Sequence, residues 1–297
     1  MRVLITGASG FIGFPLSNKL SELGFKVLAI GRSIPVNSHK SISWIKSDLN
    51  SVETYKDDIT AFKPEVLIHL AWQDIPDFSF EKSFFNLNQS IKFISFIAEI
   101  KSCRKIIISG SCWEYGKDQG ECKDSDKSIP TNYFTLAKHS LRLWTEIIAK
   151  EKSITLGWFR LFYVYGPGQR PESLIPTLFQ YLRNEKLPEI KTPHNANDFI
   201  YIDDVVDAFS IAANSPFKSG IYNLGAGKSI SALEICRQAE QLVLNSSVLT
   251  KKIELTSKSI NSNTNFWASI SSSKEQLKWS PKVSIFEGIQ KSWKQFK

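Results

Sequence analysis

The chain has 297 residues, of which 42% are hydrophobic and 12% aromatic, and its formal net charge is +8. This composition is typical of a globular protein, and the length suits one large α/β domain or a nucleotide-binding domain with a smaller lobe. The basic residues form doublets such as Lys251-Lys252 rather than a dense run, so we expect no nucleic-acid partner and favour an enzyme that handles anionic nucleotides.

Cysteine spacing and hydropathy narrow the class of protein further. The cysteines form no C-x-x-C pair and have no histidine at ligand spacing, so we expect neither a metal site nor disulfides; they are Cys103, Cys112, Cys122 and Cys236. No apolar run approaches the roughly eighteen residues of a membrane-spanning helix. The sequence opens directly into an apolar strand without a signal peptide, and we therefore expect a cytoplasmic protein with no membrane partner.

A glycine-rich turn follows the first predicted strand. Residues 2–6 form a short apolar run, Gly7, Gly10 and Gly13 follow at three-residue spacing, and residues 14–23 show the apolar spacing of a helix. Strand, glycine turn and helix in this order are typical of a dinucleotide site. The glycines permit a tight turn and close approach to a pyrophosphate, to which the start of the helix offers unpaired N–H groups.

The second predicted strand, 26–30, ends where dinucleotide-binding folds select their cofactor. An acidic residue at this point binds the ribose hydroxyls of NAD, whereas a basic residue binds the 2′-phosphate of NADP. Here Gly31 stands in the place of the acid and Arg32 follows it, which favours NADP over NAD. The alternative is a solvated loop arginine, or one that stacks on the adenine of NAD.

Strands and helices then alternate up to residue 165. We predict strands at 42–45, 66–70, 105–108 and 154–163, and helices at 84–100 and 132–150. This alternation predicts a doubly wound parallel sheet, whose ligands bind at the carboxyl ends of its strands. The 132–150 helix has two apolar sides, Leu141/Trp144/Ile148 and Leu143/Ile147, so we expect one side to face the sheet and the other a partner subunit.

Beyond residue 168 the pattern is less regular. We predict helices at 173–184 and 203–215, short strands at 199–202 and 220–223, and a final helix from Ser284 after a turn at Pro281. Another helix is expected to begin behind Ser231, with Glu234 closing a capping box, and to end near Leu244. Residues 246–275 are rich in serine, asparagine and lysine, and show little periodicity.

Several motifs occur in the order that is typical of a known family. They are the glycine turn 7–13, His69-Leu70-Ala71, Ser111 followed by Tyr115-Gly116, Lys138, and the segments 160–168, 198–204 and 222–225. The chain resembles the extended short-chain dehydrogenase/reductases of the nucleotide-sugar epimerase and dehydratase group over nearly all its length. Its segments 110–116 and 160–169 look most like those of 6-deoxy-L-talose 4-dehydrogenases and related 4-ketoreductases.

The resemblance implies a domain organisation and a set of site residues. It implies a Rossmann domain (1–168 and 196–224), an interleaved substrate domain (169–195 and 225–297), a nucleotide sugar between them, and a homodimer formed through two long helices. It places the cofactor on Gly7, Ser9, Gly10, Phe11, Ile12, Gly13, Arg32, Ser33, Asp48, Leu49, Leu70, Ala71, Trp72, Asn86, Lys138, Phe162 and Val164. It places the substrate on Cys112, Trp113, Tyr163, Arg170, Asn197 and Tyr201.

The same resemblance implies a proton-transfer site that this chain does not complete. By position, Ser111 would hydrogen-bond the sugar oxygen, and Lys138 would hold the nicotinamide ribose and lower the pKa of a tyrosine four residues earlier. That position holds Phe134, and Tyr133 lies about 100° around the helix from it. Three explanations stay open: an engineered tyrosine replacement, another proton donor (Tyr133, Cys112 or a water held by Ser111), or nucleotide binding without catalysis.

The reaction type can be narrowed in the same way. Dehydratases of this group carry an Asp-Glu pair directly after the serine or threonine, whereas this chain has Cys112 and Trp113, so we do not expect dehydration. Reduction of a 4-keto sugar by NADPH, favoured by Arg32, and epimerisation with tightly bound NAD remain. Asn197 stands where relatives often carry an arginine that grips a diphosphate, which leaves Arg170, Lys191 and Lys228 as phosphate candidates. The alternative to an enzyme is a catalytically silent protein that binds the cofactor.

Overall fold

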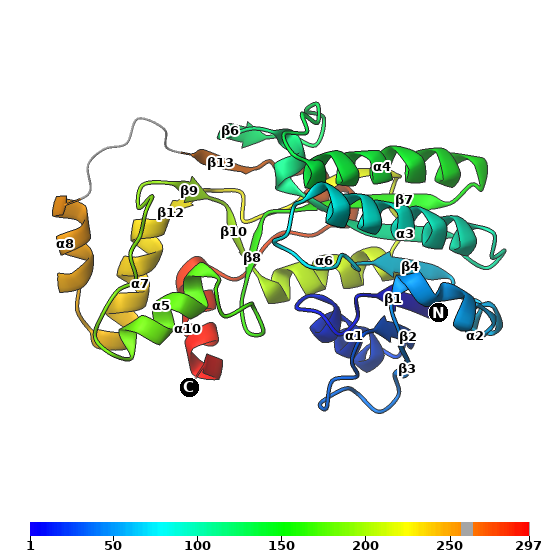
Figure 1. Ribbon diagram of the computed structural model, residues 1–297, viewed down its shortest axis with the longest axis horizontal. Coiled ribbons are helices and arrows are strands. Elements are labelled where there is room, and N and C mark those ends of the chain that lie inside the picture. Colours follow the sequence, from blue (N-terminus) through cyan, green and yellow to red (C-terminus); the bar gives the residue numbers. More distant parts are fainter. Residues whose placement is uncertain (257–263, 297) are drawn as a thin grey trace.

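A seven-stranded parallel sheet forms the centre of the computed structural model, which describes residues 1–256 and 264–296 (Figure 1). The strand order is β11-β7-β5-β4-β1-β2-β3. The strands are β1 (Arg2–Thr6), β2 (Lys26–Gly31), β3 (Ser43–Lys46), β4 (Val66–His69), β5 (Lys105–Ser111), β7 (Thr155–Leu161) and β11 (Gly220–Leu224). Because the chain runs outward from β1 to β3 and then returns to β4 on the other side of β1, the strand order reverses between β1 and β4.

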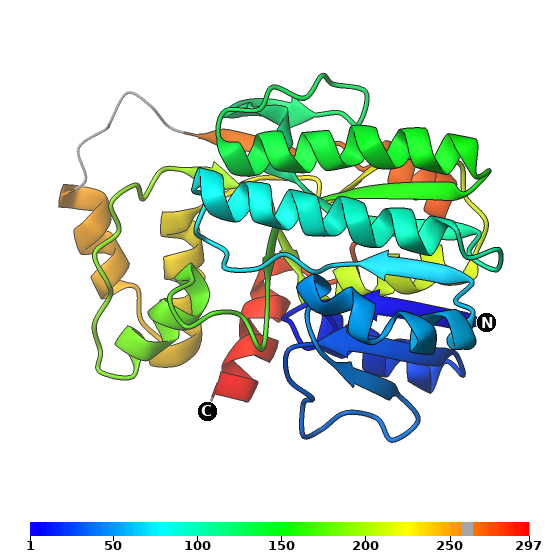
Figure 2. The same cartoon turned by 45° about the vertical axis from the view of Figure 1, so that its right-hand side comes forward.

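Helices cover both faces of this sheet. α1 (Gly13–Glu22) and α6 (Ile202–Asn214) lie on one face, and α2 (Lys56–Phe62), α3 (Phe80–Ala98) and α4 (Tyr133–Glu151) on the other (Figures 1 and 2). Neighbouring side chains of β1 point to opposite faces, so Ile5 packs in the core with Leu16 of α1, while Leu4 packs with Ile94 of α3. Burial on both faces explains why β1, β4 and β5 are continuous apolar runs.

A smaller lobe lies beside the sheet. Its helices are α5 (Leu174–Leu182), α7 (Ala232–Leu244), α8 (Val248–Thr256) and α10 (Ile285–Phe296). Two small sheets join it to the centre, one made of β8 (Tyr163–Tyr165) and β10 (Phe199–Tyr201), the other of β6 (Gln119–Cys122), β9 (Ala196–Asn197), β12 (Ile230–Ser231) and β13 (Asn265–Ala268). α9 (Ser271–Leu277) and the 3₁₀ helices η1 (Leu49–Thr54) and η2 (Cys112–Tyr115) complete the described elements.

The predicted strands and helices up to residue 165 are confirmed to within a few residues, except that the strand predicted at 154–163 ends at Leu161 and β8 follows it. Two regions differ from prediction. No strand is predicted from the sequence at β6, because its strand conformation comes from parallel pairing with β13 rather than from its own sequence. Within 246–275, predicted as irregular and partly outside the described residues, the chain forms α8, β13 and α9.

Two finer predictions about helices were wrong. Ser231 caps α7 by accepting a hydrogen bond from the N–H of Glu234 at 3.1 Å, but the Glu234 carboxylate pairs with Arg237 at 2.5 Å instead of closing a capping box. On α4, Trp144 was grouped with Leu141 and Ile148 as one apolar side of the helix. Its side chain is instead 54% exposed, because the buried side continues from Leu141 through small residues that fit against the sheet.

The sheet pairings cross the predicted domain boundaries. β6 and β9 fall in the residues predicted for the Rossmann domain, yet they pair with β13 and β12 in the second small sheet. The division into 1–168 with 196–224 and 169–195 with 225–297 therefore stays a prediction. Among residues 1–256 and 264–296, no helix has the length and apolar character needed to cross a membrane, and no cluster of acidic, histidine and cysteine side chains could hold a metal. The four cysteines are free and buried.

Candidate active site

The glycine turn leaves β1 at the point where the strand order reverses. Gly7 has a φ of +69°, and a Cβ on it would lie 2.8 Å from the Ala71 nitrogen. A Cβ on Gly13 would lie 2.1 Å from the Gly7 carbonyl oxygen, so only glycine allows α1 to pack this closely on the turn. No side chain caps the start of α1 at Ile12. The turn and this uncapped helix end fit the pyrophosphate of a dinucleotide.

The end of β2 lacks the acidic side chain that binds ribose hydroxyls. A Cβ on Gly31 would lie 2.7 Å from Ser9 Oγ, so Ser9 fills the space that an acidic side chain would need. The side chain of Arg32 is 65% exposed, and its guanidinium lies 3.9 Å from a carboxylate oxygen of Asp74. Because an exposed pair at this distance is weak, Arg32 is available to an anionic ligand.

The segment after β4, from Leu70 to Trp72, forms the next wall of the site. Asn86 on α3 holds the backbone that follows it, accepting a hydrogen bond from the N–H of Gln73 at 2.7 Å and donating one to its carbonyl at 3.2 Å. Since both ends of its amide are used in this way, Asn86 positions the wall. His69 is bonded on both ring nitrogens, to Thr6 and Ser90, and burial lowers its pKa to about 3, so it is a neutral structural residue.

Ser111 and Lys138 both lie at the end of β5. The hydroxyl of Ser111 accepts a hydrogen bond from the N–H of Trp113 at 3.2 Å. Lys138, on α4, donates from Nζ to the Ser109 carbonyl at 2.9 Å, and Nζ lies 4.0 Å from the centroid of the Trp72 ring. Burial lowers the pKa of Lys138 to about 8. The ammonium group is thus held at the strand end without a buried anion in direct contact.

Aromatic side chains surround Phe134, the residue at the predicted tyrosine position. Its ring centroid lies 4.8 Å from that of Phe78, 5.6 Å from Trp72 and 6.4 Å from Trp113. We call these four residues the aromatic cluster. Tyr133 is outside it, because α4 begins at Tyr133 and turns this ring outward, where it is 55% exposed and packs against Phe80.

The predicted substrate residues divide into two groups. Trp113 donates from Nε1 to the hydroxyl of Tyr163 at 3.1 Å, which joins β8 to the aromatic cluster. Cys112 is buried, and burial raises the pKa of its thiol well above the usual range, so the thiol stays protonated at neutral pH. By contrast, Tyr201 is 2% exposed and packs against Tyr165 and α10.

Other predicted residues take positions around this centre. Asn197 has a buried Oδ1 with no hydrogen-bond partner. Arg170 donates to the Ile75 carbonyl at 2.7 Å, in the loop that also carries Phe78. Asp48 accepts a hydrogen bond from the N–H of Asn50 and so caps η1. The remaining predicted cofactor residues lie in the turn, at strand ends or in η1: Gly10, Phe11, Ser33, Leu49, Ala71, Phe162 and Val164.

The sequence analysis missed Glu114, which lies fully buried beneath Ser111. Its carboxylate accepts hydrogen bonds from the N–H of Ser111 at 2.8 Å, from Trp158 Nε1 at 3.1 and 3.0 Å, and from Arg160 Nε at 3.3 Å. Neither Glu114 nor Arg160 is exposed to solvent. The sequence signal for this residue was an acid between Trp113 and Tyr115 at a strand end. Burial of an unpaired carboxylate there would be unfavourable, so a buried partner could have been expected.

Lys138 gives a prediction about stability. We expect Lys138→Met to raise the free energy of unfolding at pH 7 by about 1–2 kcal/mol, since the lowered pKa means that burying the charge is unfavourable, and the lost Ser109 hydrogen bond offsets part of the gain. In the folded wild type Lys138 loses its proton as the pH rises through about 8, whereas in the unfolded chain the lysine keeps its proton up to about pH 10.5. The difference in unfolding free energy between Lys138→Met and wild type should therefore decrease over that pH range. Urea denaturation measures it, with exposed Lys150→Met on the same helix as control; equal stability of wild type and Lys138→Met would contradict the prediction.

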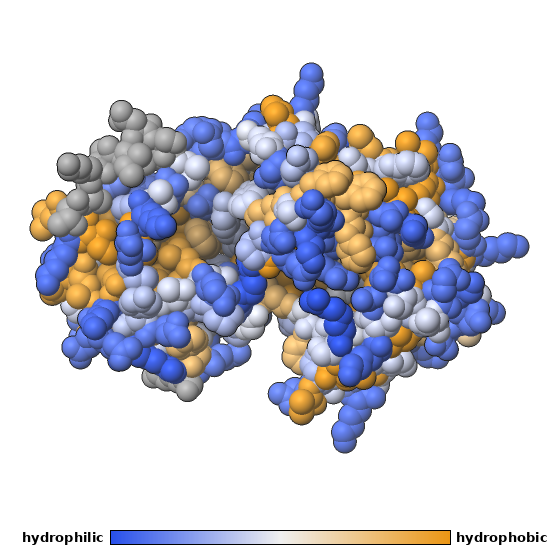
Figure 3. All heavy atoms as spheres, viewed as in Figure 1, coloured by the Kyte–Doolittle hydropathy of each residue, from blue (hydrophilic) through white to orange (hydrophobic). Residues whose placement is uncertain are grey.

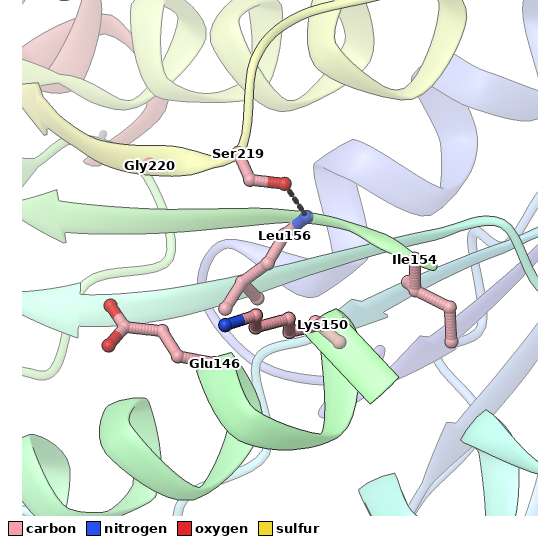
Figure 4. Close-up of a pocket in the computed structure, with 7 residues that line it drawn as sticks. Glu146, Lys150, Ile154, Leu156, Ser219 and Gly220 are labelled. Carbon is pink, nitrogen blue, oxygen red and sulfur yellow. Dashed lines mark hydrogen bonds between the residues drawn. The ribbon is translucent and has the colours of Figure 1, made fainter. Parts of the chain in front are cut away.

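A cavity of about 370 Å³ lies at the opposite end of the sheet (Figure 4). It lies between the end of α4, at Glu146 and Lys150, and the first residues of β7 and β11, where Ser219 accepts a hydrogen bond from the N–H of Leu156 at 3.0 Å. Since this is the amino-terminal edge of the strands, the cavity is remote from Ser111 and Lys138, and it plays no part in the site.

Comparison with known proteins decides the family. The model of the NAD dependent epimerase/dehydratase family matches residues 3–225. The chain belongs to this family. The dTDP-4-dehydro-6-deoxyglucose reductase of Escherichia coli is 28% identical, covering 97% of this chain and 95% of its own, and the UDP-glucuronate 4-epimerase of Thermodesulfobacterium geofontis is 26% identical, covering 97% and 94%.

A solved structure supports the fold of this family member. A tyrosine-to-phenylalanine variant of the UDP-glucuronic acid 4-epimerase of Bacillus cereus, in complex with UDP-4-deoxy-4-fluoro-glucuronic acid and NAD, matches with a TM-score of 0.81 at 22% identity. The match covers 100% of this chain and 99% of that one. The family match confirms the predicted resemblance to the nucleotide-sugar epimerase and dehydratase group, and this structure confirms the doubly wound Rossmann-type fold.

Proposed function

We propose that this epimerase/dehydratase-family protein reduces the 4-keto group of a nucleotide-linked sugar with NADPH. The main support for this proposal is the end of β2. Ser9 packs against Gly31 in the space that an acidic side chain would need, and the exposed Arg32 is available to a 2′-phosphate. A cofactor that serves as reductant must exchange at each turnover, and NADPH is the form that an arginine here selects. The 28% identity to a reductase over almost the whole chain supports the same function.

The residues of the site take defined roles in this proposal. The glycine turn would hold the pyrophosphate, Arg32 the 2′-phosphate, and Lys138 the nicotinamide ribose, for which the Trp72 ring must leave its place on Lys138 Nζ. When bound, the cofactor would supply a hydride. Ser111 would donate a hydrogen bond to the sugar oxygen, and Asn197, with its unpartnered Oδ1, would accept one from the substrate.

Two other functions have a specific observation in their favour. A nucleotide-sugar epimerase with tightly bound NAD is supported by the relative that is 26% identical over 97% of the chain. A cofactor-binding protein without catalysis is supported by Phe134, whose ring cannot exchange a proton. NAD retained through purification would favour the epimerase, and binding of NADPH without turnover in any variant would favour the silent protein.

Turnover of defined substrates tests the proposal. The purified protein is mixed with NADPH and nucleoside-diphosphate 4-keto-6-deoxyhexoses that differ in the base, and NADPH oxidation is followed by absorbance. We expect one NADPH to be consumed for each 4-hydroxy sugar formed, and NADH to be a poor substitute. Formation of a C4 epimer from a 4-hydroxy nucleotide sugar, with no net oxidation of NADPH, would overturn the proposal.

We propose also that two copies associate through α3 and α4. These helices lie side by side and present exposed apolar side chains, among which Phe84 is 56%, Trp144 54% and Ile147 58% exposed (Figures 2 and 3). The double substitution Trp144→Lys with Ile147→Lys should convert a dimer to a monomer in sedimentation velocity. Ile129→Lys, at a similarly exposed residue outside both helices, should leave the dimer intact; a wild-type monomer would contradict the proposal.

A further inference from the structure

A reduction needs a proton as well as a hydride, and Phe134 cannot supply one. The chain has eight tyrosines, and four of their hydroxyls are donors within the fold. These four bonds run from Tyr55 to the Asp48 carbonyl, from Tyr115 to Asn223 Oδ1, from Tyr165 to the Ile285 carbonyl, and from Tyr222 to the Lys218 carbonyl. Their protons are therefore committed to structural partners.

Three of the remaining tyrosines lie away from the aromatic cluster. Tyr133 is exposed and packs on Phe80, Tyr181 is 44% exposed on α5, and Tyr201 is buried against Tyr165 and α10. Only Tyr163, among the residues that the structure describes, has a phenol hydroxyl bonded to a member of the cluster. Its position on β8 places this hydroxyl beside the residues that follow Ser111.

The hydrogen bond to Tyr163 has a direction that matters. Trp113 can only donate through Nε1, so the Tyr163 oxygen is the acceptor in the 3.1 Å contact and its own hydrogen is left for another partner. The ring centroid of Trp113 lies 6.4 Å from that of Phe134, and the backbone N–H of Trp113 donates a hydrogen bond to the Ser111 hydroxyl. Trp113 thereby links the Tyr163 hydroxyl to both predicted catalytic positions, 111 and 134.

We propose that Tyr163 is the catalytic proton donor of this protein, in the place of the tyrosine that Phe134 replaces. The inference rests on the proposed reductase function. The sugar carbonyl carbon gains a hydride from the reduced cofactor, its oxygen gains the phenolic proton of Tyr163, and the O–H bond of Tyr163 breaks. The ketone is reduced to an alcohol, the cofactor is oxidised, and the phenolate regains a proton from water.

The surroundings of Tyr163 suit donation rather than abstraction of a proton. Burial raises the pKa of Tyr163 to about 12, so the phenol stays protonated at neutral pH and can protonate an alkoxide, which is a stronger base. The same high pKa makes its phenolate rare, so near pH 7 Tyr163 is suited to act as a general acid.

Four proteins test the inference: wild type, Tyr163→Phe, Phe134→Tyr and the double variant. Tyr163→Phe should lower kcat by about 10²–10⁴-fold, the usual contribution of a positioned general acid, while NADPH binding measured by calorimetry stays unchanged. The double variant should recover most of the lost rate, because Phe134→Tyr restores a phenol near Lys138. Tyr181→Phe, an exposed tyrosine on α5, is the matched control and should behave as wild type.

A crystal structure with the 4-hydroxy product gives a readout independent of rate. We expect the Tyr163 hydroxyl within about 2.6–3.2 Å of the sugar O4. Unchanged turnover in Tyr163→Phe would overturn the inference and leave the proposed function standing, whereas an inactive wild type beside an active Phe134→Tyr variant would overturn both. Inactivity of all four proteins on every 4-keto nucleotide sugar would overturn the proposed function itself.

Discussion

Replacing Glu114 by alanine is expected to lower the free energy of unfolding by about 3–5 kcal/mol, the usual result of removing one partner from a buried ion pair. Arg160 would keep a charge with no solvent exposure and no anion, since its remaining contacts are the Ser128 hydroxyl and the Tyr115 ring, 4.2 Å away. The indole N–H of Trp158 and the backbone N–H of Ser111 would lose their acceptor as well.

Thermal and urea unfolding measure this effect. Glu151→Ala, at an exposed residue at the end of α4, is the control and should change stability by less than about 0.5 kcal/mol. Glu114→Gln keeps the shape and one acceptor oxygen but not the charge, so it should fall between Glu114→Ala and wild type. If Glu114→Ala unfolds at the same urea concentration as Glu151→Ala, the buried network does not stabilise the fold as described.

Arg32→Ala is expected to weaken NADPH binding by about 10–100-fold and to leave NADH binding unchanged. A hydrogen bond to a charged group contributes about 1.5–3 kcal/mol, and Arg32 is the cation that would meet the 2′-phosphate, which NADH lacks. Calorimetric titration with each cofactor gives both affinities. Arg104→Ala removes the same charge directly before β5, at the amino-terminal end of the strands, and should alter neither affinity.

An acidic residue introduced at the end of β2 should reverse the preference from NADPH to NADH. Gly31→Asp alone would place its Cβ 2.7 Å from Ser9 Oγ, so it is combined with Ser9→Gly to make room. The new carboxylate would bind ribose hydroxyls and repel a 2′-phosphate, and we expect the double variant to bind NADH more tightly than NADPH. Equal NADPH affinity in wild type and Arg32→Ala would show that the end of β2 does not select the cofactor.

The central sheet was predictable because its signals are local. β1 is an apolar run followed by glycines that close packing requires, and β2, β4 and β5 are further apolar runs. β6 and β13 could not be predicted in this way, since each becomes a strand by pairing with the other across more than a hundred residues of chain. The start of α8 depends on a side chain of the preceding helix, the Glu240 carboxylate, which accepts hydrogen bonds from the N–H groups of Leu249 and Thr250.

The candidate site was predictable where motif positions fix strand ends. Ser111 and Lys138 were predicted together, and the structure brings both to the end of β5. Helix geometry predicted that Tyr133 would turn away from Phe134, and the start of α4 places it so. Glu114 and the Trp113–Tyr163 bond could not be predicted, because each depends on the spacing between β5, β7 and β8 rather than on neighbouring sequence.

The cofactor content of the purified protein tests the central claim most directly. The protein is unfolded without exposure to added nucleotide, and any released dinucleotide is identified by mass; a second sample is titrated with NADPH and NADH. If NADPH is the reductant and exchanges at each turnover, the unfolded sample should release NADP or no dinucleotide. The titrated sample should then bind NADPH more tightly than NADH. One NAD per chain, retained through purification and not displaced by NADPH, would contradict this account and indicate an epimerase.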